Sequence, residues 1–506
     1  MGIVFRQSVK TTIIAFSGAL LGALINYVYT FILTKPQLGY SKDLIYQGAV
    51  LQVFVLLGVN STVATFIPRY SHNKQKSLLT ISVFVPLIVT VLLSVPYVIF
   101  RSKILSFFQV EDAVFINTFY LWLPLLILLW SYMSLFELYL ISQVKVAIPT
   151  FMREIVLRLL NIVLIILFAF KLISFYYFII GTILVYAVPP LALLLVSLKT
   201  DSFGFSFNWK IFSKEEFKEI FRFSWYHLLL GATINLLGYI DSLMLGSMDK
   251  KGFSSLAVYS QALLIISIML IPYRAMTLAT FPILNKAYID NDKKKVRDLF
   301  HRSSINILIV AIAMFLIIIC NLDNVVTIFP KGYEAIKPIV VILMIGRMID
   351  MATGLNTELT SITMYYKVTF RLSVILLVML VIFNRIFIPE YGIYGAAWAS
   401  TLALAFFNLA KMIFLWKKLG IQPFTTKSII VIFAGLIAGI AGYYFPTIIH
   451  ATSDASRSTI IICTIADAIM RTIIIIISYS ILLLLLKPSP DLNEYLQTVR
   501  AKKRLF

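Results

Sequence analysis

The sequence predicts an all-α polytopic membrane protein with about fourteen transmembrane helices, the number of bilayer-length apolar stretches in the chain. We expect two pseudo-symmetric six-helix lobes followed by two trailing helices, and three observations support this: composition, recurring apolar stretches and an internal repeat. Of the 506 residues, 60% are hydrophobic and 13% are charged. Soluble domains carry roughly a quarter charged residues, so a chain this apolar needs the bilayer as its solvent.

The apolar stretches recur from one end of the chain to the other. Each has about 20 residues, the length that crosses a bilayer as a helix. The first follows Arg6 and Lys10 and has no small-residue cleavage motif behind it, so we expect it to be retained as a span. The expected spans are 11–33, 44–67, 78–100, 114–140, 150–170, 174–197, 220–246, 254–283, 304–322, 335–365, 369–389, 392–416, 427–449 and 459–486.

The basic residues test this count and orient the chain. The formal net charge is +21. If the N-terminus is cytoplasmic, Lys and Arg concentrate in the segments that would also face the cytoplasm, which is the positive-inside pattern of membrane proteins. We therefore expect both termini in the cytoplasm. The charge is explained by topology and by anionic lipid headgroups, so no nucleic acid partner is expected.

The two halves of the chain resemble each other. Leu20–Asn26 matches Leu229–Asn235, and Ala64–Pro68 matches Ala279–Pro282, in the same order. Parallel repeats of this kind typically enclose a central site, although a repeat that only helps packing stays an alternative. The expected organisation is an N-terminal six-helix lobe (1–198), a cytoplasmic linker (199–219), a C-terminal six-helix lobe (220–418), two accessory helices (419–486) and a basic cytoplasmic tail (487–506).

Short motifs carry a resemblance to a known superfamily. They are Ile240–Gly246, Leu256–Ala262 and Gly392–Ala399, and the stretch Leu38-Gly39-Tyr40 resembles a loop of the same proteins. With the span number and the two lobes, they make the chain similar to the multidrug/oligosaccharidyl-lipid/polysaccharide exporter superfamily, and within it to the Wzx-type polysaccharide flippases. The resemblance implies a cavity between the lobes that opens alternately inward and outward. It does not fix the substrate, because drug exporters share the fold.

Ionisable residues inside spans are costly and mark candidate sites. In the fifth span, Arg153, Glu154 and Arg158 form a cluster in which Glu154 and Arg158 are i,i+4 neighbours. Arg158 lies about 12 Å along the helix from its predicted cytoplasmic end, which is too deep for easy snorkelling. Two interpretations stay open for Arg158: a cavity cation that binds pyrophosphate, with Arg153 beside it, or an internal salt bridge with Glu154.

A polar stripe marks the tenth span. Arg347, Asp350, Gly354 and Glu358 recur at three or four residues and would share one helix face, with Asn356 beside it. This stripe favours Arg347 and Asn356 as substrate contacts and Asp350 or Glu358 as a coupling-ion site. The alternative is that Arg347 and Asp350 only pair with each other.

Arg274 and Asp241 complete the candidate set. Arg274 follows Pro272, which should kink the eighth span and free a backbone carbonyl, so Arg274 is a further candidate cavity cation. For Asp241, near the outer end of the seventh span, the resemblance to drug exporters of the superfamily implies ion coupling, because those proteins use lobe carboxylates for it. The alternatives are that Asp241 only caps the helix or pairs with Lys250. The resemblance implies a cationic cavity in general, and guanidinium suits this role because it binds diphosphate bidentately and stays charged.

These features favour a flippase that moves a polyprenyl-diphosphate-linked oligosaccharide from the cytoplasmic to the outer leaflet by alternating access, for cell-surface polysaccharide biosynthesis. The alternative is a Na⁺- or H⁺-coupled exporter of drugs or metabolites, which would need acidic more than basic cavity residues. An enzyme is not expected, because the outward loops are short. No nucleotide-binding glycine loop occurs, so ATP is not expected to drive transport directly.

The remaining expectations concern location and partners. The expected location is a bacterial inner membrane, and the expected partners are the lipid-linked oligosaccharide, membrane lipids and polysaccharide assembly proteins. No cofactor is expected beyond a coupling Na⁺ or H⁺. The spacing of Cys320, Cys463 and the four histidines does not predict a metal site.

Overall fold

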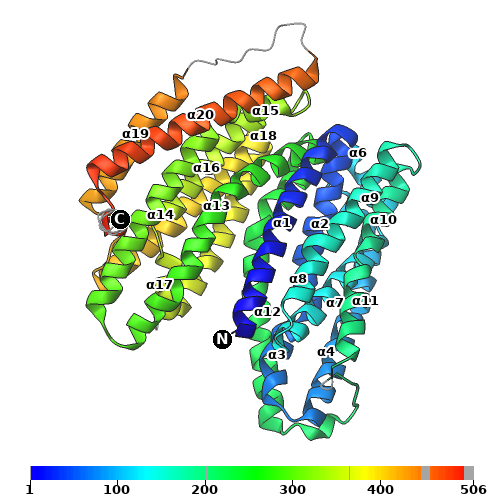
Figure 1. Cartoon of the computed structure of the whole chain (residues 1–506). Coiled ribbons are helices and arrows are strands. Elements are labelled where there is room, and N and C mark those ends of the chain that lie inside the picture. The colour runs from blue at the N-terminus through cyan, green and yellow to red at the C-terminus, as the bar shows by residue number, and fades with distance from the viewer. Residues whose placement is uncertain (1, 201–202, 364, 446–455, 495–506) are drawn as a thin grey trace. The chain divides into compact units, whose positions relative to one another are not determined.

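The computed structural model describes residues 2–200, 203–363, 365–445 and 456–494, which form helices and no β-strand. Ten helices in these ranges are long and apolar enough to cross a membrane, or twelve if each of two bent helix pairs is one span. The all-α, multi-span fold is therefore confirmed, while the count of fourteen and the cytoplasmic termini stay predictions. Two compact units divide the chain at Ser260 and Gln261, inside α13 (Figure 1).

Unit 1 has its main apolar core around α7. Side chains of α3, α4, α7 and α11 meet there, and Val63, Leu79, Leu135 and Tyr139 are almost fully buried. The elements of unit 1 are α1 (Gly2–Ile32), α2 (Lys35–Leu56), α3 (Val59–Phe66), η1 (Ile67–Arg69), α4 (His72–Ile99), α5 (Arg101–Leu105), α6 (Val110–Phe119), α7 (Trp122–Ser142), α8 (Ala147–Phe151), η2 (Met152–Val156), α9 (Leu157–Ala169), α10 (Phe175–Val185), α11 (Val188–Leu198), η3 (Trp209–Ile211), α12 (Lys214–Met248) and the first turns of α13 (Gly252–Ile289).

The second predicted span begins earlier in the structure than in the sequence prediction. Helix α2 starts at Lys35, directly after Thr34, and has Pro36 in its first turn. The Thr34 backbone N–H donates to Gln37 Oε1 over 3.0 Å, which closes the helix end. The stretch Leu38-Gly39-Tyr40 is therefore helical, and the prediction that it forms a loop is wrong.

The segments matched by the internal repeat adopt the same local structure. In α1 the Asn26 amide donates to the carbonyl of Gly22 over 2.7 Å, and in α12 the Asn235 amide donates to the carbonyl of Gly231 over 2.9 Å. Helix α12 packs along α2 and α3 within unit 1. The predicted lobe limits, including the linker at 199–219, stay predictions.

Unit 2 contains a compact layer of α14, α19 and α20. A Cβ atom at Gly435 would lie 2.5 Å from Ile312 Cγ2, and one at Gly439 would lie 2.8 Å from Leu316 Cδ2, so these glycines let α19 approach α14 closely. After α13, the elements of unit 2 are α14 (Lys293–Cys320), α15 (Leu322–Ile328), α16 (Ile336–Ala352), α17 (Asn356–Ile362), α18 (Tyr366–Leu419), α19 (Thr426–Tyr443) and α20 (Arg457–Leu486).

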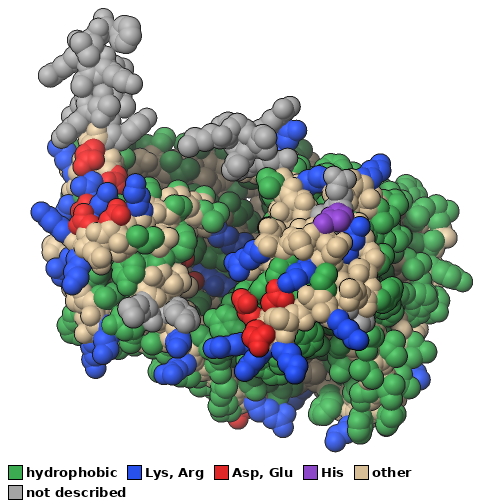
Figure 2. Space-filling model, turned by 90° about the horizontal axis from the view of Figure 1, so that it is seen from below, with side chains coloured by type: hydrophobic (Ala, Val, Ile, Leu, Met, Phe, Trp, Pro, Cys, Tyr) green, Lys and Arg blue, Asp and Glu red, His purple; other side chains and the backbone are tan. Residues whose placement is uncertain are grey.

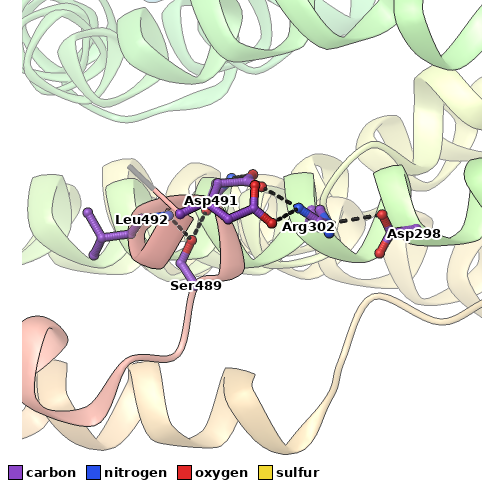
Figure 3. A network of polar contacts seen from close by, with 7 residues as sticks. Asp298, Arg302, Ser489, Asp491 and Leu492 are labelled. Carbon is purple, nitrogen blue, oxygen red and sulfur yellow. Dashed lines mark hydrogen bonds and ion pairs between the residues drawn. The ribbon is translucent and has the colours of Figure 1, made fainter. Parts of the chain in front are cut away.

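The segment after α20 is attached to α14 by an ion-pair network (Figure 3). Arg302 Nη1 lies 3.0 Å from both Asp491 Oδ1 and Glu494 Oε1, and Arg302 Nε lies 2.9 Å from Asp298 Oδ2. One guanidinium thus holds three carboxylates from two segments. Most of the predicted basic tail, residues 495–506, lies outside the described residues.

Helix α18 is broken at Gly392, between the predicted spans 369–389 and 392–416. Gly392 has φ 55° and ψ −130°, a conformation that side chains other than glycine rarely adopt. A Cβ atom at Gly395 would lie 2.5 Å from the carbonyl carbon of Phe387, so the chain folds back tightly at this point. The Gly-Ile-Tyr-Gly motif therefore has a structural role in the turn.

We expect Gly392→Asn to destabilise the protein by about 1–3 kcal/mol, because the backbone at Gly392 lies outside the left-handed helical region that asparagine tolerates. The matched control is Gly420→Asn, since Gly420 has φ 65° and ψ 23° and open space around its Cα. Thermal denaturation of both purified variants measures the effect. Equal melting temperatures for the two variants would contradict the proposed strain.

Candidate functional site

Unit 1 holds four charged side chains in one network, here called the unit 1 polar cluster: Glu137, Arg153, Glu154 and Arg158. Arg153 Nη1 lies 2.9 Å from Glu137 Oε1, and Arg153 Nε lies 3.4 Å from Glu154 Oε1. Arg158 Nη2 lies 2.5 Å from Glu154 Oε2. Two cations and two anions make the cluster neutral. The internal salt bridge proposed for Arg158 is present, and its role as a cavity cation stays a prediction.

The local backbone explains how these charges fit between helices. Residues Met152–Val156 form a π-helical segment, η2, between α8 and α9, and such insertions are frequent at functional sites. A Cβ atom at Gly18 would lie 2.6 Å from Glu154 Cβ, and one at Gly22 would lie 2.7 Å from Arg158 Cζ. The missing side chains of Gly18 and Gly22 therefore let α1 approach the Glu154–Arg158 ion pair.

A second polar group in unit 1 surrounds Lys42, which lies between the expected spans 11–33 and 44–67. Lys42 lies on α2, its Nζ donates to Asn26 Oδ1 of α1, and it lies 6.0 Å from the ring centre of Tyr29. Tyr46 of α2 stacks on Tyr239 of α12 with ring centres 5.1 Å apart. The capping signal around Thr34 could have revealed that Lys42 is part of a helix.

Two carboxylates of unit 1, Asp241 and Asp112, each accept a hydrogen bond from another helix or segment. The Tyr259 hydroxyl donates to Asp241 Oδ2 over 3.3 Å, so the candidate carboxylate Asp241 has a hydroxyl partner. The Phe253 backbone N–H donates to Asp112 Oδ2 over 2.8 Å. Burial raises the pKa of the Asp112 carboxyl to about 6, and the hydrogen bond from Phe253 opposes that rise. The hydrogen bond from Phe253 favours the ionised form of Asp112.

In unit 2 the predicted polar stripe does not lie on one continuous helix. The helix breaks between Ala352 and Asn356, and α16 and α17 meet at a bend of 45°. Gly354 has φ 65° at the break. The prediction of one shared face is therefore wrong, because it extrapolated a straight helix through this glycine. Broken spans of this kind expose backbone groups that bind ions and substrates in transporters.

The unit 2 polar cluster brings the stripe residues together with a cation from another helix. It consists of Arg347, Asp350, Glu358 and Lys411, and Asn356 lies in the first turn of α17 beside Thr357, the hydrogen-bond partner of Lys411. Arg347 Nη1 lies 3.6 Å from Asp350 Oδ2, a long ion pair. Both polar atoms of the Asn356 side chain and Glu358 Oε2 are buried without a hydrogen-bond partner among the described residues. Such orphaned groups are uncommon and mark a candidate ligand site.

Lys411 of α18 is the cation that the sequence analysis overlooked. It lies in the expected span 392–416, and only 1% of it is exposed, so it is buried among the helices of unit 2. Its Nζ donates to Thr357 Oγ1 over 2.6 Å and lies 4.1 Å from the ring centre of Phe407. Asp350 and Glu358 are both close enough to interact with its charge.

Arg274 is placed apart from these networks. Helix α13 continues through Pro272 as one helix, and the Arg274 side chain is exposed within its unit. No ion pair involves Arg274 in the described part of the chain. Within the same ranges, no group of three His, Cys, Asp or Glu side chains could hold a metal ion.

Comparisons with known proteins agree with these features. A family model described as polysaccharide biosynthesis protein matches residues 5–288. The chain is similar in structure to a lipid II flippase MurJ in an inward closed conformation, with a TM-score of 0.71, 16% identity, and coverage of 94% of this chain and 99% of that chain. No curated protein matches the chain.

Two further similar structures are described as transporters of the MOP superfamily. An inward-facing multidrug resistance MATE family transporter has a TM-score of 0.63 and 16% identity, and the match covers 79% of this chain and 94% of that chain. A transporter from Pyrococcus furiosus has a TM-score of 0.54 and 15% identity over 83% of this chain and 95% of that chain. At such identities the likeness shows the fold alone.

Proposed function

The chain belongs to the polysaccharide biosynthesis protein family, and we propose that it is a flippase for a polyprenyl-diphosphate-linked oligosaccharide. In this proposal the protein lies in a bacterial inner membrane and moves the sugar head group from the cytoplasmic to the outer leaflet by alternating access. The similar structure described as a lipid II flippase supports a lipid-linked substrate. No chemical step is required, because only the head group changes sides.

The observation that carries this proposal is the set of cations inside the apolar helices of unit 1. Arg158 keeps 26% of its side chain exposed, although it is paired with Glu154. Lys42 has a neutral partner, Asn26. Cations held among apolar helices are costly, which favours a role in binding an anion such as diphosphate.

Tyrosines between these two cations suit the sugar part of the substrate. Lys42 lies near the Tyr29 ring, and Tyr186 is close enough to both Tyr29 and Arg158 for their charges to interact. A tyrosine offers an apolar ring face together with a hydroxyl. In our proposal the diphosphate binds at Arg158 and Lys42, and the sugar contacts the tyrosines.

We expect Arg158→Ala to weaken substrate binding roughly ten- to a hundredfold, since a hydrogen bond to a charged group contributes about 1.5–3 kcal/mol. The measurement is binding of a fluorescent polyprenyl-diphosphate oligosaccharide to the full-length protein in nanodiscs, followed by translocation in proteoliposomes. The control is Lys103→Ala, at the exposed helix α5 away from the polar clusters. A dephosphorylated lipid should bind weakly to every variant.

Glu154→Gln separates a substrate contact from a structural ion pair. It neutralises the carboxylate 2.5 Å from Arg158 and leaves the guanidinium free to bind phosphate. Tighter binding in this variant supports the proposal. If Glu154→Gln and Arg158→Ala lower the melting temperature equally and leave diphosphate binding unchanged, Arg158 is a structural cation and the proposed site is refuted.

The unit 2 polar cluster favours one alternative function. Its two carboxylates, Asp350 and Glu358, are candidate groups for Na⁺ or H⁺ coupling, and the similar MATE structure is described as a multidrug resistance transporter. A cation-coupled exporter would release a preloaded cationic dye from proteoliposomes when a Na⁺ or H⁺ gradient is applied. Gradient-driven dye release, together with no diphosphate-dependent binding, would establish the alternative.

A further inference from the structure

A cavity of about 460 Å³ lies at one end of unit 2, separate from the unit 2 polar cluster. It is formed where α13 ends, where α14 begins and where α18 ends, so it lies at a level where several long helices terminate together. Figure 2 views the molecule from below Figure 1, and Lys and Arg side chains are spread over that face among apolar and other polar ones. Its polar lining consists of Tyr288, Asn291, Lys293, Arg297, Tyr365 and Lys418.

Three of these residues are cations from two helices. Lys293 and Arg297 are i,i+4 neighbours in the first turns of α14, and Lys418 lies in the last turn of α18. Arg297 Nη2 donates to the carbonyl of Gly420 over 2.9 Å, which fixes its guanidinium at the cavity. In the described ranges, none of the three has an ion-pair partner.

Two nearby carboxylates, Asp292 and Asp298, have partners outside the cavity lining. Asp292 Oδ1 accepts the backbone N–H of Lys295 and caps α14. Asp298 pairs with Arg302 over 2.9 Å, in the network that holds the segment after α20. The lining itself contains three cations and no carboxylate.

The rest of the lining defines the ligand further. Tyr288, Tyr365 and Asn291 add side chains that donate hydrogen bonds, whereas Val296, Leu359 and Ile421 are apolar. Three cations with additional donors are the groups that bind a phosphate. Apolar side chains in the same cavity suit a ligand that is also partly apolar. Basic pockets between helix ends at a membrane surface commonly bind lipid headgroups.

We propose that this cavity binds the phosphate of an anionic phospholipid. The phosphodiester contacts Lys293, Arg297 and Lys418, and the glycerol backbone lies against the apolar side chains. A free phosphate compound shares the same chemistry, so the experiment includes it as a separate arm. The inference does not depend on the proposed transport function.

The test measures lipid retention by native mass spectrometry of the full-length protein. We expect the wild type to retain phosphatidylglycerol in preference to phosphatidylcholine. The triple variant Lys293→Gln, Arg297→Gln and Lys418→Gln should lose this preference, with each neutralised cation weakening retention roughly fivefold. The matched control is Lys294→Gln, Lys295→Gln and Lys417→Gln, which removes equal charge from neighbouring residues outside the cavity lining.

Retention that falls only in the cavity variant supports the proposal. Equal losses in both triple variants would overturn the proposal, because lipid retention would then depend on diffuse surface charge. No loss in either variant would also overturn it, because the lipid would then bind elsewhere. Glycerol phosphate that binds as tightly as the lipid would refute the lipid assignment. The single variants Lys293→Gln and Lys418→Gln remove no hydrogen bond seen in the structure, so they test the site even if the triple variant is unstable.

Discussion

Replacing Gly39 with alanine is expected to prevent stable folding of unit 1. An added Cβ atom would lie 2.5 Å from the carbonyl carbon of Phe253 and 2.8 Å from its Cα, and closer still to its carbonyl oxygen. These are backbone atoms, which cannot move aside as a flexible side chain can. Phe253 is fully buried, and its backbone N–H is bound to Asp112. We expect a cost above about 3 kcal/mol, the upper end of ordinary overpacking.

Two other glycines provide matched controls for this prediction. A Cβ atom at Gly48, also on α2, would lie 3.4 Å from Leu126 Cδ2, an ordinary contact distance. A Cβ atom at Gly238 on α12 would meet nothing within 4 Å. Folded yield and melting temperature in detergent should therefore be lowest for Gly39→Ala, close to wild type for Gly48→Ala, and unchanged or higher for Gly238→Ala. A Gly39→Ala protein as stable as Gly238→Ala would contradict the close approach.

The glycine pairs show what the sequence could predict and where it stopped. The spacing of Gly18 with Gly22, and of Gly435 with Gly439, predicts close helix packing, because both residues of each pair lie on one helix face. The structure agrees for both pairs. The partners could not be predicted, because they come from distant segments: Glu154 with Arg158 in unit 1, and Ile312 with Leu316 in unit 2.

The sequence predicted that the polar residues at 347–358 gather in one place, but it gave the wrong helix geometry for them. Periodicity assumes a straight helix, whereas α16 ends at Ala352 and α17 begins at Asn356. Gly354 has positive φ, the conformation in which many helices end, so a glycine after Thr353 was a readable signal for the break. No comparable signal existed for Lys411, because its partner Thr357 lies 54 residues away.

Replacing Lys411 with methionine is expected to destabilise unit 2 by about 1.5–3 kcal/mol, because it removes the charged hydrogen bond to Thr357 Oγ1 and the attraction between the Lys411 ammonium and two nearby carboxylates. Methionine preserves most of the side-chain volume and removes the ammonium that lies beside Asp350 and Glu358. Glu358 Oε2 is already buried without a hydrogen-bond partner among the described residues. Without Lys411, Arg347 would be the remaining cation of the unit 2 polar cluster. Its ion pair with Asp350 is long, at 3.6 Å. Thermal denaturation in detergent measures the loss.

A second substitution tests whether charge, and not packing, causes this loss. Glu358→Gln removes the negative charge that Lys411 offsets, so the double variant Lys411→Met/Glu358→Gln should recover most of the stability that Lys411→Met loses. The double-mutant cycle then gives an interaction energy of roughly 1–3 kcal/mol for the pair. Asp298→Asn is the matched control, because Asp298 lies in the Arg302 network outside the unit 2 polar cluster and should not rescue Lys411→Met. Additive losses in the double variant would mean that Lys411 stabilises α18 through Thr357 and Phe407 alone, since those contacts involve no carboxylate.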